Sequence, residues 1–197
     1  MVSPLYSEVA EKVQIIRDIL SDDDALYSLA EFPPGIDLNA SMALASYREA
    51  FALPDRSDEV ADINLDNLNL PVGLVELYQI SDSPMAGGIE FYSESQLTKG
   101  SVLDAEGIPC SIQEHWLRFA LVANDNFLVS LTDGRVMYSD HSAWRYGSTN
   151  SSRIVSSDVL SFVNEYMLGP KYLEFEPTHG LEEVYGWYRF LREHSLV

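Results

Sequence analysis

The sequence predicts an α+β protein: a mainly antiparallel, twisted sheet flanked by helices at both ends of the chain. Apolar residues recur at helical spacing within 5–20 and again within 181–194, as in amphipathic helices. Between 89 and 139 they form short runs separated by turn residues. The clearest turn is Asp133-Gly134, a pair that strongly favours a hairpin.

The composition is that of a globular protein with a large acidic excess. The 197 residues are 46% hydrophobic and include 12 Lys and Arg against 31 Asp and Glu, a net charge of −19. This charge argues against direct binding to nucleic acid or to an anionic membrane surface. A single Cys excludes an intrachain disulfide. The start of the chain resembles no signal peptide, so we expect a cytoplasmic protein. The length of the chain suits a single domain over 1–197.

The first third of the chain is predicted to be helical. A helix is expected over 5–20, and Asp22, Asp23 and Asp24 can cap a short helix after them. A third helix is expected over 39–52, before an acidic connection over 54–64. Pro71 suits the first turn of a further apolar helix that reaches Tyr78.

Strands are predicted in the middle of the chain, at 89–92, 115–123, 127–131 and 136–139. A helical turn is expected over 93–97, and polar loops are expected over 100–114 and 144–153. Gly134 is expected to adopt a positive φ angle. One set of side chains is predicted to lie mostly in the core: Trp116, Phe119, Leu121, Phe127, Val129 and Leu131. A second set is predicted to face the other side of the sheet: Leu117, Val122 and Leu128.

Helices return at the end of the chain. Ser156-Ser157-Asp158 is expected to cap a helix that continues to Met167 and ends before Gly169-Pro170. A last helix is expected over 181–194, with these residues on one face: Leu181, Val184, Tyr185, Tyr188 and Leu191.

No motif in the sequence predicts an enzyme, and we expect no cofactor and no metal. The four histidines lack the spacing of a helical zinc motif, and there is no phosphate-binding glycine loop and no nucleophile elbow. Cys110 would need a base such as His141 nearby to act as a nucleophile. A Cys/His hydrolase or deamidase is therefore kept as an alternative.

Residues 69–168 resemble the SUKH superfamily, which includes bacterial toxin-immunity proteins and fungal cell-wall-synthesis regulators. The similarity is in the order of short segments: Leu70 to Tyr78, Gly87 to Ser93, Trp116 to Ala123, Phe127 to His141 and Ser156 to Met167. It implies a core over about 65–170. Outside this core, the residue pattern predicts a helical extension over 1–60 and a C-terminal helix over 181–195. The Gly-Asp pair usual before the hairpin is replaced here by Ala123-Asn124-Asp125-Asn126.

The resemblance implies a non-catalytic protein-binding module that neutralises a cognate toxin, such as a basic nuclease. A regulatory scaffold that binds a housekeeping protein is the alternative on the same fold. Residues 1–98 hold 18 acidic and four basic residues, which favours a basic partner protein. The predicted partner-binding residues are acidic: Asp55, Asp58, Glu59, Asp62, Asp66, Glu90 and Glu94.

Overall fold

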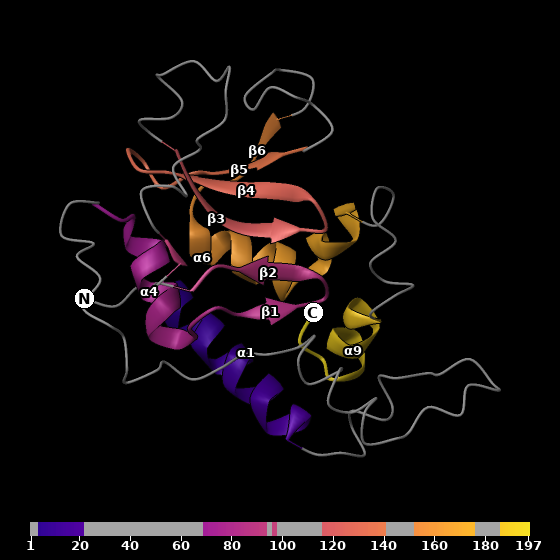
Figure 1. The fold of residues 1–197 in the computed structure, drawn as a ribbon. Helices are drawn as coiled ribbons and strands as arrows, with labels where there is room; N and C mark the ends of the chain where they lie inside the picture. Colours follow the sequence, from indigo (N-terminus) through magenta and orange to yellow (C-terminus); the bar gives the residue numbers. More distant parts are fainter. Residues whose placement is uncertain (1–3, 22–68, 94–95, 98–115, 141–151, 176–185) are drawn as a thin grey trace. The chain divides into compact units, whose positions relative to one another are not determined.

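The computed structural model describes residues 4–21, 69–93, 96–97, 116–140, 152–175 and 186–197 (Figure 1). The chain divides into two compact units. One comprises residues 1–53, 85–88 and 163–197, and the other comprises 54–84 and 89–162. The predicted helices over 25–29 and 39–52 and the predicted loop over 100–114 lie outside the described residues.

Among the described residues, six strands form one sheet in the order of the sequence, and the helices precede and follow most of it, so the predicted α+β class is confirmed. Strands β2 to β6 pair antiparallel with their neighbours. Two strands were not predicted, namely β1 and β6. The strand bounds are β1 Met85–Ala86, β2 Ile89–Phe91, β3 Trp116–Val122, β4 Asp125–Ser130, β5 Val136–Ser139 and β6 Ser152–Ser156.

The turn between β4 and β5 lies where the sequence predicts it. Gly134 has a φ of 79°, and its amide donates to the Ser130 carbonyl at 2.9 Å. The Ser130 hydroxyl also accepts from the amides of Thr132 and Asp133, each at 3.3 Å. The Asp133 carboxylate accepts from the Arg135 amide and guanidinium at 3.2 and 2.7 Å. Side chains therefore satisfy the amides that the turn leaves out of the strand ladder.

The turn between β3 and β4 has a less favourable residue. It contains two residues, and the first, Ala123, has a φ of 52°. A side chain with a Cβ is disfavoured in this region, which glycine adopts readily. Ala123 thus carries local backbone strain.

A β-bulge in β3 changes the predicted facing of its side chains. The register with β4 shifts between Arg118 and Ala120, so Phe119 is the extra residue. An extra residue reverses the alternation of faces beyond it. Leu117, Phe119, Ala120 and Val122 are all fully buried, whereas Trp116 and Leu121 are partly exposed. The prediction that Trp116 and Leu121 belong to the core was therefore wrong, as was the prediction that Leu117 and Val122 face the other side. Leu131, after β4, is also partly exposed, contrary to its predicted place in the core.

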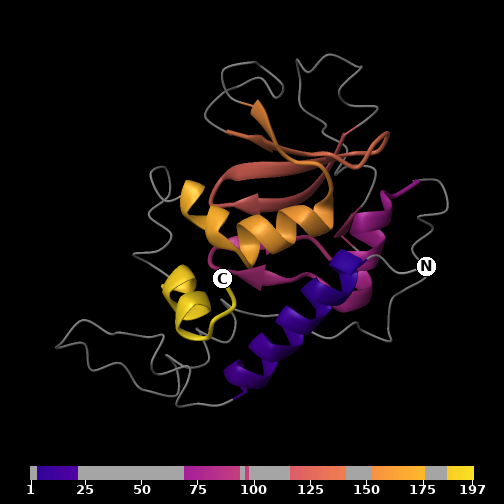
Figure 2. The same ribbon diagram turned by 180° about the vertical axis from the view of Figure 1, so that it is seen from behind.

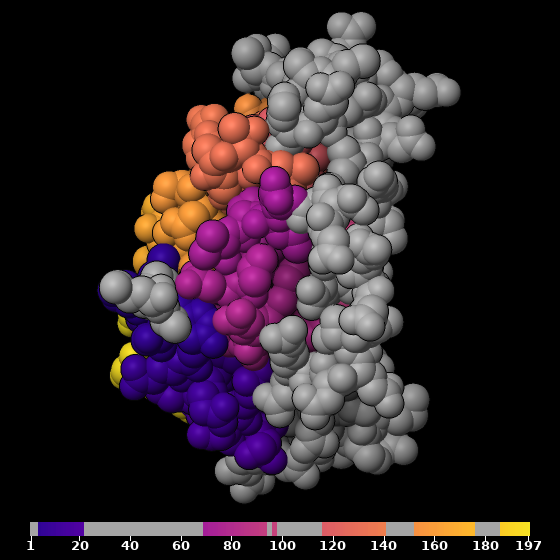
Figure 3. All heavy atoms as spheres, turned by 90° about the vertical axis from the view of Figure 1, so that its left-hand side faces the viewer, coloured from indigo at the N-terminus to yellow at the C-terminus, as the bar shows by residue number. Residues whose placement is uncertain are grey.

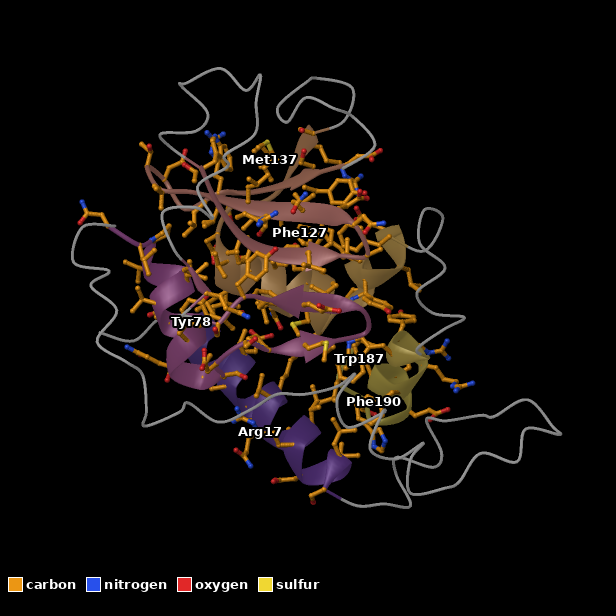
Figure 4. All side chains as sticks on the ribbon, in the orientation of Figure 1. Arg17, Tyr78, Phe127, Met137, Trp187 and Phe190 are labelled. Carbon is orange, nitrogen blue, oxygen red and sulfur yellow. The ribbon has the colours of Figure 1, made fainter. Side chains whose placement is uncertain are left out.

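One face of the sheet is covered by helix α6, Val159–Phe162 (Figure 2). A cluster of phenylalanines makes this contact. The Phe162 ring centre lies 4.6 Å from that of Phe127, 6.0 Å from that of Phe119 and 6.1 Å from that of Phe91. All four rings are nearly or fully buried. Burying such a side chain contributes roughly 1.5–3 kcal/mol, so this cluster fixes the core of its unit. Phe127 is labelled on β4 in Figure 4.

The start of α6 is capped as predicted. The Asp158 carboxylate accepts from the Ser161 amide at 2.9 Å and from the Ser161 hydroxyl at 2.6 Å. The first bond satisfies an amide at the start of the helix that has no intrahelical acceptor. The strand β6 directly precedes this cap, in a segment whose first two residues were predicted as loop.

Helix α4, Val72–Ile80, confirms the predicted helix after Pro71, although Pro71 is its N-cap and not a residue of the first turn. Its buried residues are Leu74, Leu77, Tyr78 and Ile80. The Tyr78 hydroxyl donates to the Tyr92 carbonyl at 2.8 Å, which ties the helix to the end of β2 (Figure 4).

In the other unit, the predicted first helix is α1, Pro4–Leu20, which buries Val9, Val13 and Ile16. Lys12 donates to the Asn164 side-chain oxygen at 2.8 Å, and Asn164 donates to Glu8 at 2.9 Å. Two further helical segments lie in this unit, the π-helix η4 over Val163–Met167 and the 3-10 helix η5 over Pro170–Phe175. The predicted end before Gly169-Pro170 agrees with these bounds.

The last helix, α9, comprises Trp187–Glu193 and begins after Gly186, whose φ is 59°. Its buried residues are Trp187, Phe190 and Leu191, and Tyr188 is partly exposed. The predicted continuous helix over 181–194 was wrong at Gly186, which precedes the helix. The Trp187 indole donates to the Met167 carbonyl at 2.7 Å. Figure 4 labels Trp187 and Phe190, whose rings stack at 5.1 Å. Residues 181–185 lie outside the described part of the chain.

We predict opposite stability changes at the two turns. Gly134→Ala should lower the free energy of unfolding by about 1–2 kcal/mol, because a Cβ is strained at positive φ. Among the described residues that Cβ would meet only Pro71, at an ordinary 3.6 Å. Ala123→Gly should raise the free energy of unfolding by about 0.5–1 kcal/mol, because glycine relieves the strain at positive φ. Urea unfolding of both variants measures this, and changes of the same sign would contradict the assigned turns.

Candidate interaction surface

The sheet has a second face, which we call the Arg118 face. Strand pairing places Glu90 beside Leu121, and Arg118 beside Leu128. Glu90 precedes Phe91, and Arg118 precedes Phe119. Because successive residues of a strand point to opposite sides of a sheet, both pairs lie on the side away from the phenylalanine cluster. The residues assigned to the Arg118 face are Glu90, Tyr92, Trp116, Arg118, Leu121, Asn126, Leu128, Ser130, Met137, Ser139, Ser152 and Ile154.

Exposure varies across the Arg118 face. Glu90 is exposed, and the Ile154 side chain is 48% exposed. Four residues on β3 or at the end of β2 are partly exposed: Tyr92, Trp116, Arg118 and Leu121. Leu128 and Met137 are buried, and Figure 4 labels Met137 on β5. The accessible part of this face is therefore centred on β2 and β3.

Arg118 is held on this face without a full set of acceptors. Its guanidinium carbon lies 5.2 Å from the centre of the Tyr92 ring, a cation–π geometry. One terminal nitrogen donates to the Asn126 side-chain oxygen over a long 3.5 Å. Within the described part of the chain, the buried Nε has no hydrogen-bond partner. A buried donor left unpaired costs about 1–3 kcal/mol, so the contacts with Tyr92 and Asn126 hold the guanidinium here at a cost in stability.

The structure places only one of the predicted partner-binding residues. Glu90 lies exposed on β2, on the Arg118 face. The other six, Asp55, Asp58, Glu59, Asp62, Asp66 and Glu94, lie outside the described residues. Sequence reasoning searched for acidic residues and so missed Trp116, Arg118 and Tyr92. The spacing Trp116-x-Arg118 in a predicted strand was the available signal, because it places both side chains on one face.

The described residues carry little of the acidic excess. They contain 13 acidic and eight basic residues, a net charge of −5 of the total −19. Three of the four histidines and the single cysteine, Cys110, also lie outside this part. His194 follows α9, and its ring lies 4.7 Å from that of Phe190. Among the described residues, no group of three His, Cys, Asp or Glu side chains is placed to bind a metal ion.

A polar ladder lies on the opposite face, at the start of β4. Tyr138 donates from its hydroxyl to the Asp125 carboxylate, and the Arg153 guanidinium lies 5.7 Å from the Tyr138 ring centre. Burial raises the pKa of Tyr138 well above its ordinary value, and the bond to Asp125 raises it further. Asp125 is 5% exposed. This ladder joins the strands β4, β5 and β6, and we interpret it as structural.

No family model, no curated protein and no solved structure matches the chain. In the part of the chain that the structure describes, no helix has both the length and the apolar character needed to cross a membrane.

We predict that Tyr138 keeps its proton at high pH. Its raised pKa means that the stability it contributes is complete below pH 10.0, the pKa of an ordinary tyrosine. This stability is lost as the pH rises further, because the unfolded chain ionises first. The parent should therefore lose stability faster above pH 10.0 than Tyr138→Phe does.

The direct measurement is a titration of the Tyr138 Cζ resonance in protein labelled with ¹³C at tyrosine. Asp125→Asn is the matched variant, because it removes the charge and keeps the size of the side chain. Its Tyr138 pKa should move back toward the ordinary value. A Tyr138 that titrates like an ordinary tyrosine in the parent would contradict the hydrogen-bonded ladder.

Proposed function

We propose that this protein is a non-catalytic binding module that neutralises a cognate toxin, as an immunity protein does, through the Arg118 face. The observation that carries the proposal is the group Tyr92, Trp116 and Arg118, partly exposed together on one sheet face. Tyr, Trp and Arg are the residues most enriched among those that dominate binding energy at protein interfaces.

The order of the elements supports the same proposal. Helix α4 and the Gly87-Gly88 turn precede the central strands, and α6 follows the last strand. The segments that resemble the SUKH superfamily occur in this order, and each described one falls within or beside one of these elements. Members of that superfamily include immunity proteins, so a binding function suits both the fold and the exposed aromatic and arginine side chains.

The charge supports a basic partner. A net charge of −19 accelerates encounter with a cationic protein by roughly 10–10³. A nuclease that binds phosphates is one such partner, and an acidic protein seated on its phosphate-binding surface would block it. A standard interface buries roughly 1,600 Å² in total. Neutralisation of this kind would take place in the cytoplasm, before the toxin reaches its target.

The first experiment is co-expression with toxin domains encoded beside the gene. The proposal expects one such domain to be lethal alone and harmless with this chain, and to form a complex with it. If no neighbouring gene encodes such a domain, and a housekeeping protein is captured instead, the regulatory scaffold is the correct function. Loss of protection on replacing Cys110 with serine would favour the Cys/His enzyme.

Glu90→Lys should slow association with the neutralised toxin and leave dissociation nearly unchanged, because exposed charges act mainly on encounter. Glu11→Lys is the matched control, because Glu11 is exposed on α1 and its substitution changes the net charge by the same amount as Glu90→Lys. Stopped-flow kinetics at low and high salt measure both variants. Association that does not change with salt, or equal slowing by both variants, would contradict the place of Glu90 at the interface.

Arg118→Lys should speed dissociation about 30-fold, since an arginine at the centre of an interface contributes roughly 2 kcal/mol. Lysine keeps the charge and lacks the planar donors of the guanidinium. The free chain should lose no more than about 0.5 kcal/mol of stability, because among the described residues the lost Nε donor has no hydrogen-bond partner. Unchanged dissociation would contradict binding through this face.

A further inference from the structure

A groove of about 400 Å³ lies at one end of the unit that contains β2 to β6. It is formed where the start of α4, the β4–β5 turn and the start of α6 meet. In Figure 3 the start of α4 (magenta) lies beside the β4–β5 turn (salmon). The lining residues are Asn69, Leu70, Pro71, Val72, Gly73, Leu131, Thr132, Asp133, Gly134, Asp158 and Val159.

The walls of the groove are held close by the backbone. A Cβ on Gly73 would lie 3.4 Å from the Val159 amide nitrogen, so α4 and α6 approach closely at this glycine. Pro71 lies on the other side, beside Gly134 at the β4–β5 turn. The Asp158 cap fixes the start of α6 at the same place. The groove is therefore part of the folded unit, and a binding partner does not have to create it.

The lining combines apolar and acidic groups. Leu70, Pro71, Val72 and Leu131 provide an apolar surface, and the Val72 side chain is 73% exposed. Asp133 and Asp158 add two carboxylates, and among the described residues no lysine or arginine lines the groove. Hydrogen bonds from Ser130 and Arg135 lower the pKa of Asp133, so it is ionised at neutral pH.

We propose that this groove binds a short segment of the partner protein in which a lysine or arginine adjoins an apolar side chain. Asp133 is already paired with the Arg135 guanidinium at 2.7 Å, so the Asp158 carboxylate would supply most of the attraction for the cation. Val72 would contact the apolar side chain. The volume lies within the roughly 300–1,000 Å³ typical of small binding sites. The inference deepens the proposed function, since it rests on a basic partner and names a second surface that contacts it.

The test needs no toxin. Protein labelled with ¹⁵N is titrated with the peptide acetyl-Leu-Lys-Leu-Lys-Leu-amide, and with the same peptide carrying glutamate in place of lysine. The cationic peptide should shift the amide resonances of Gly73, Thr132 and Gly134 in a saturable way. The acidic peptide should leave them unchanged. Val72→Lys should weaken binding about fivefold or more, through repulsion and lost apolar contact.

Val75→Lys is the matched control. Val75 is 41% exposed on the same helix and does not line the groove, so this variant should bind within about twofold of the parent. The inference is overturned if the three amides do not shift, or if both lysine variants weaken binding equally. If the chain binds the peptide in this groove but neutralises no toxin, the proposed function is overturned and the inference that the groove binds a cationic segment still holds.

Discussion

The contact of Phe162 with Phe91, Phe119 and Phe127 is the constraint on which the binding account depends. It commits one face of the sheet to the core, because large aromatic side chains must be buried together. The bulge at Phe119 makes this possible: it turns Phe119 inward in addition to Leu117 and Ala120, and leaves Trp116, Arg118 and Leu121 on the other side. The binding surface proposed here is therefore the direct consequence of how the core is packed.

Local signals in the sequence predicted a large part of the fold. Asp133-Gly134 gave the central hairpin, Asp158 gave the start of α6, and the apolar spacing gave α1 and α4. Each of these depends on residues close together in the chain. The strands β1 and β6 were missed because β1 has two residues and β6 carries a Ser, an Arg and only two apolar residues before its last Ser. Their pairing comes from neighbouring strands, which the local pattern does not contain.

The candidate site was harder to predict. A bulge adds one residue without a sequence signature, so the faces of Trp116 and Leu121 could not be assigned by alternation alone. The net charge led the sequence reasoning to acidic residues, and of these only Glu90 falls among the described ones. Arg118 carries the opposite charge. Its importance follows from its place over Tyr92 on a partly exposed face, which only coordinates reveal.

Acidity and Arg118 have different roles in this account. The excess of carboxylates acts at a distance and raises the rate of encounter, and salt weakens this effect. Arg118, Trp116 and Tyr92 act at contact and slow dissociation. A chain can hold both because long-range attraction depends on the total charge, whereas the lifetime of a complex depends on a few buried groups.

Hydroxyl-radical footprinting of the chain, free and bound to the toxin that it neutralises, tests the central claim most directly. Trp116 and Tyr92 are partly exposed in the free chain and react readily with radicals. The account predicts that binding strongly protects both of them and leaves Tyr188, on α9, as reactive as before. Protection of Tyr188 with unchanged oxidation of Trp116 and Tyr92 would contradict binding through the Arg118 face.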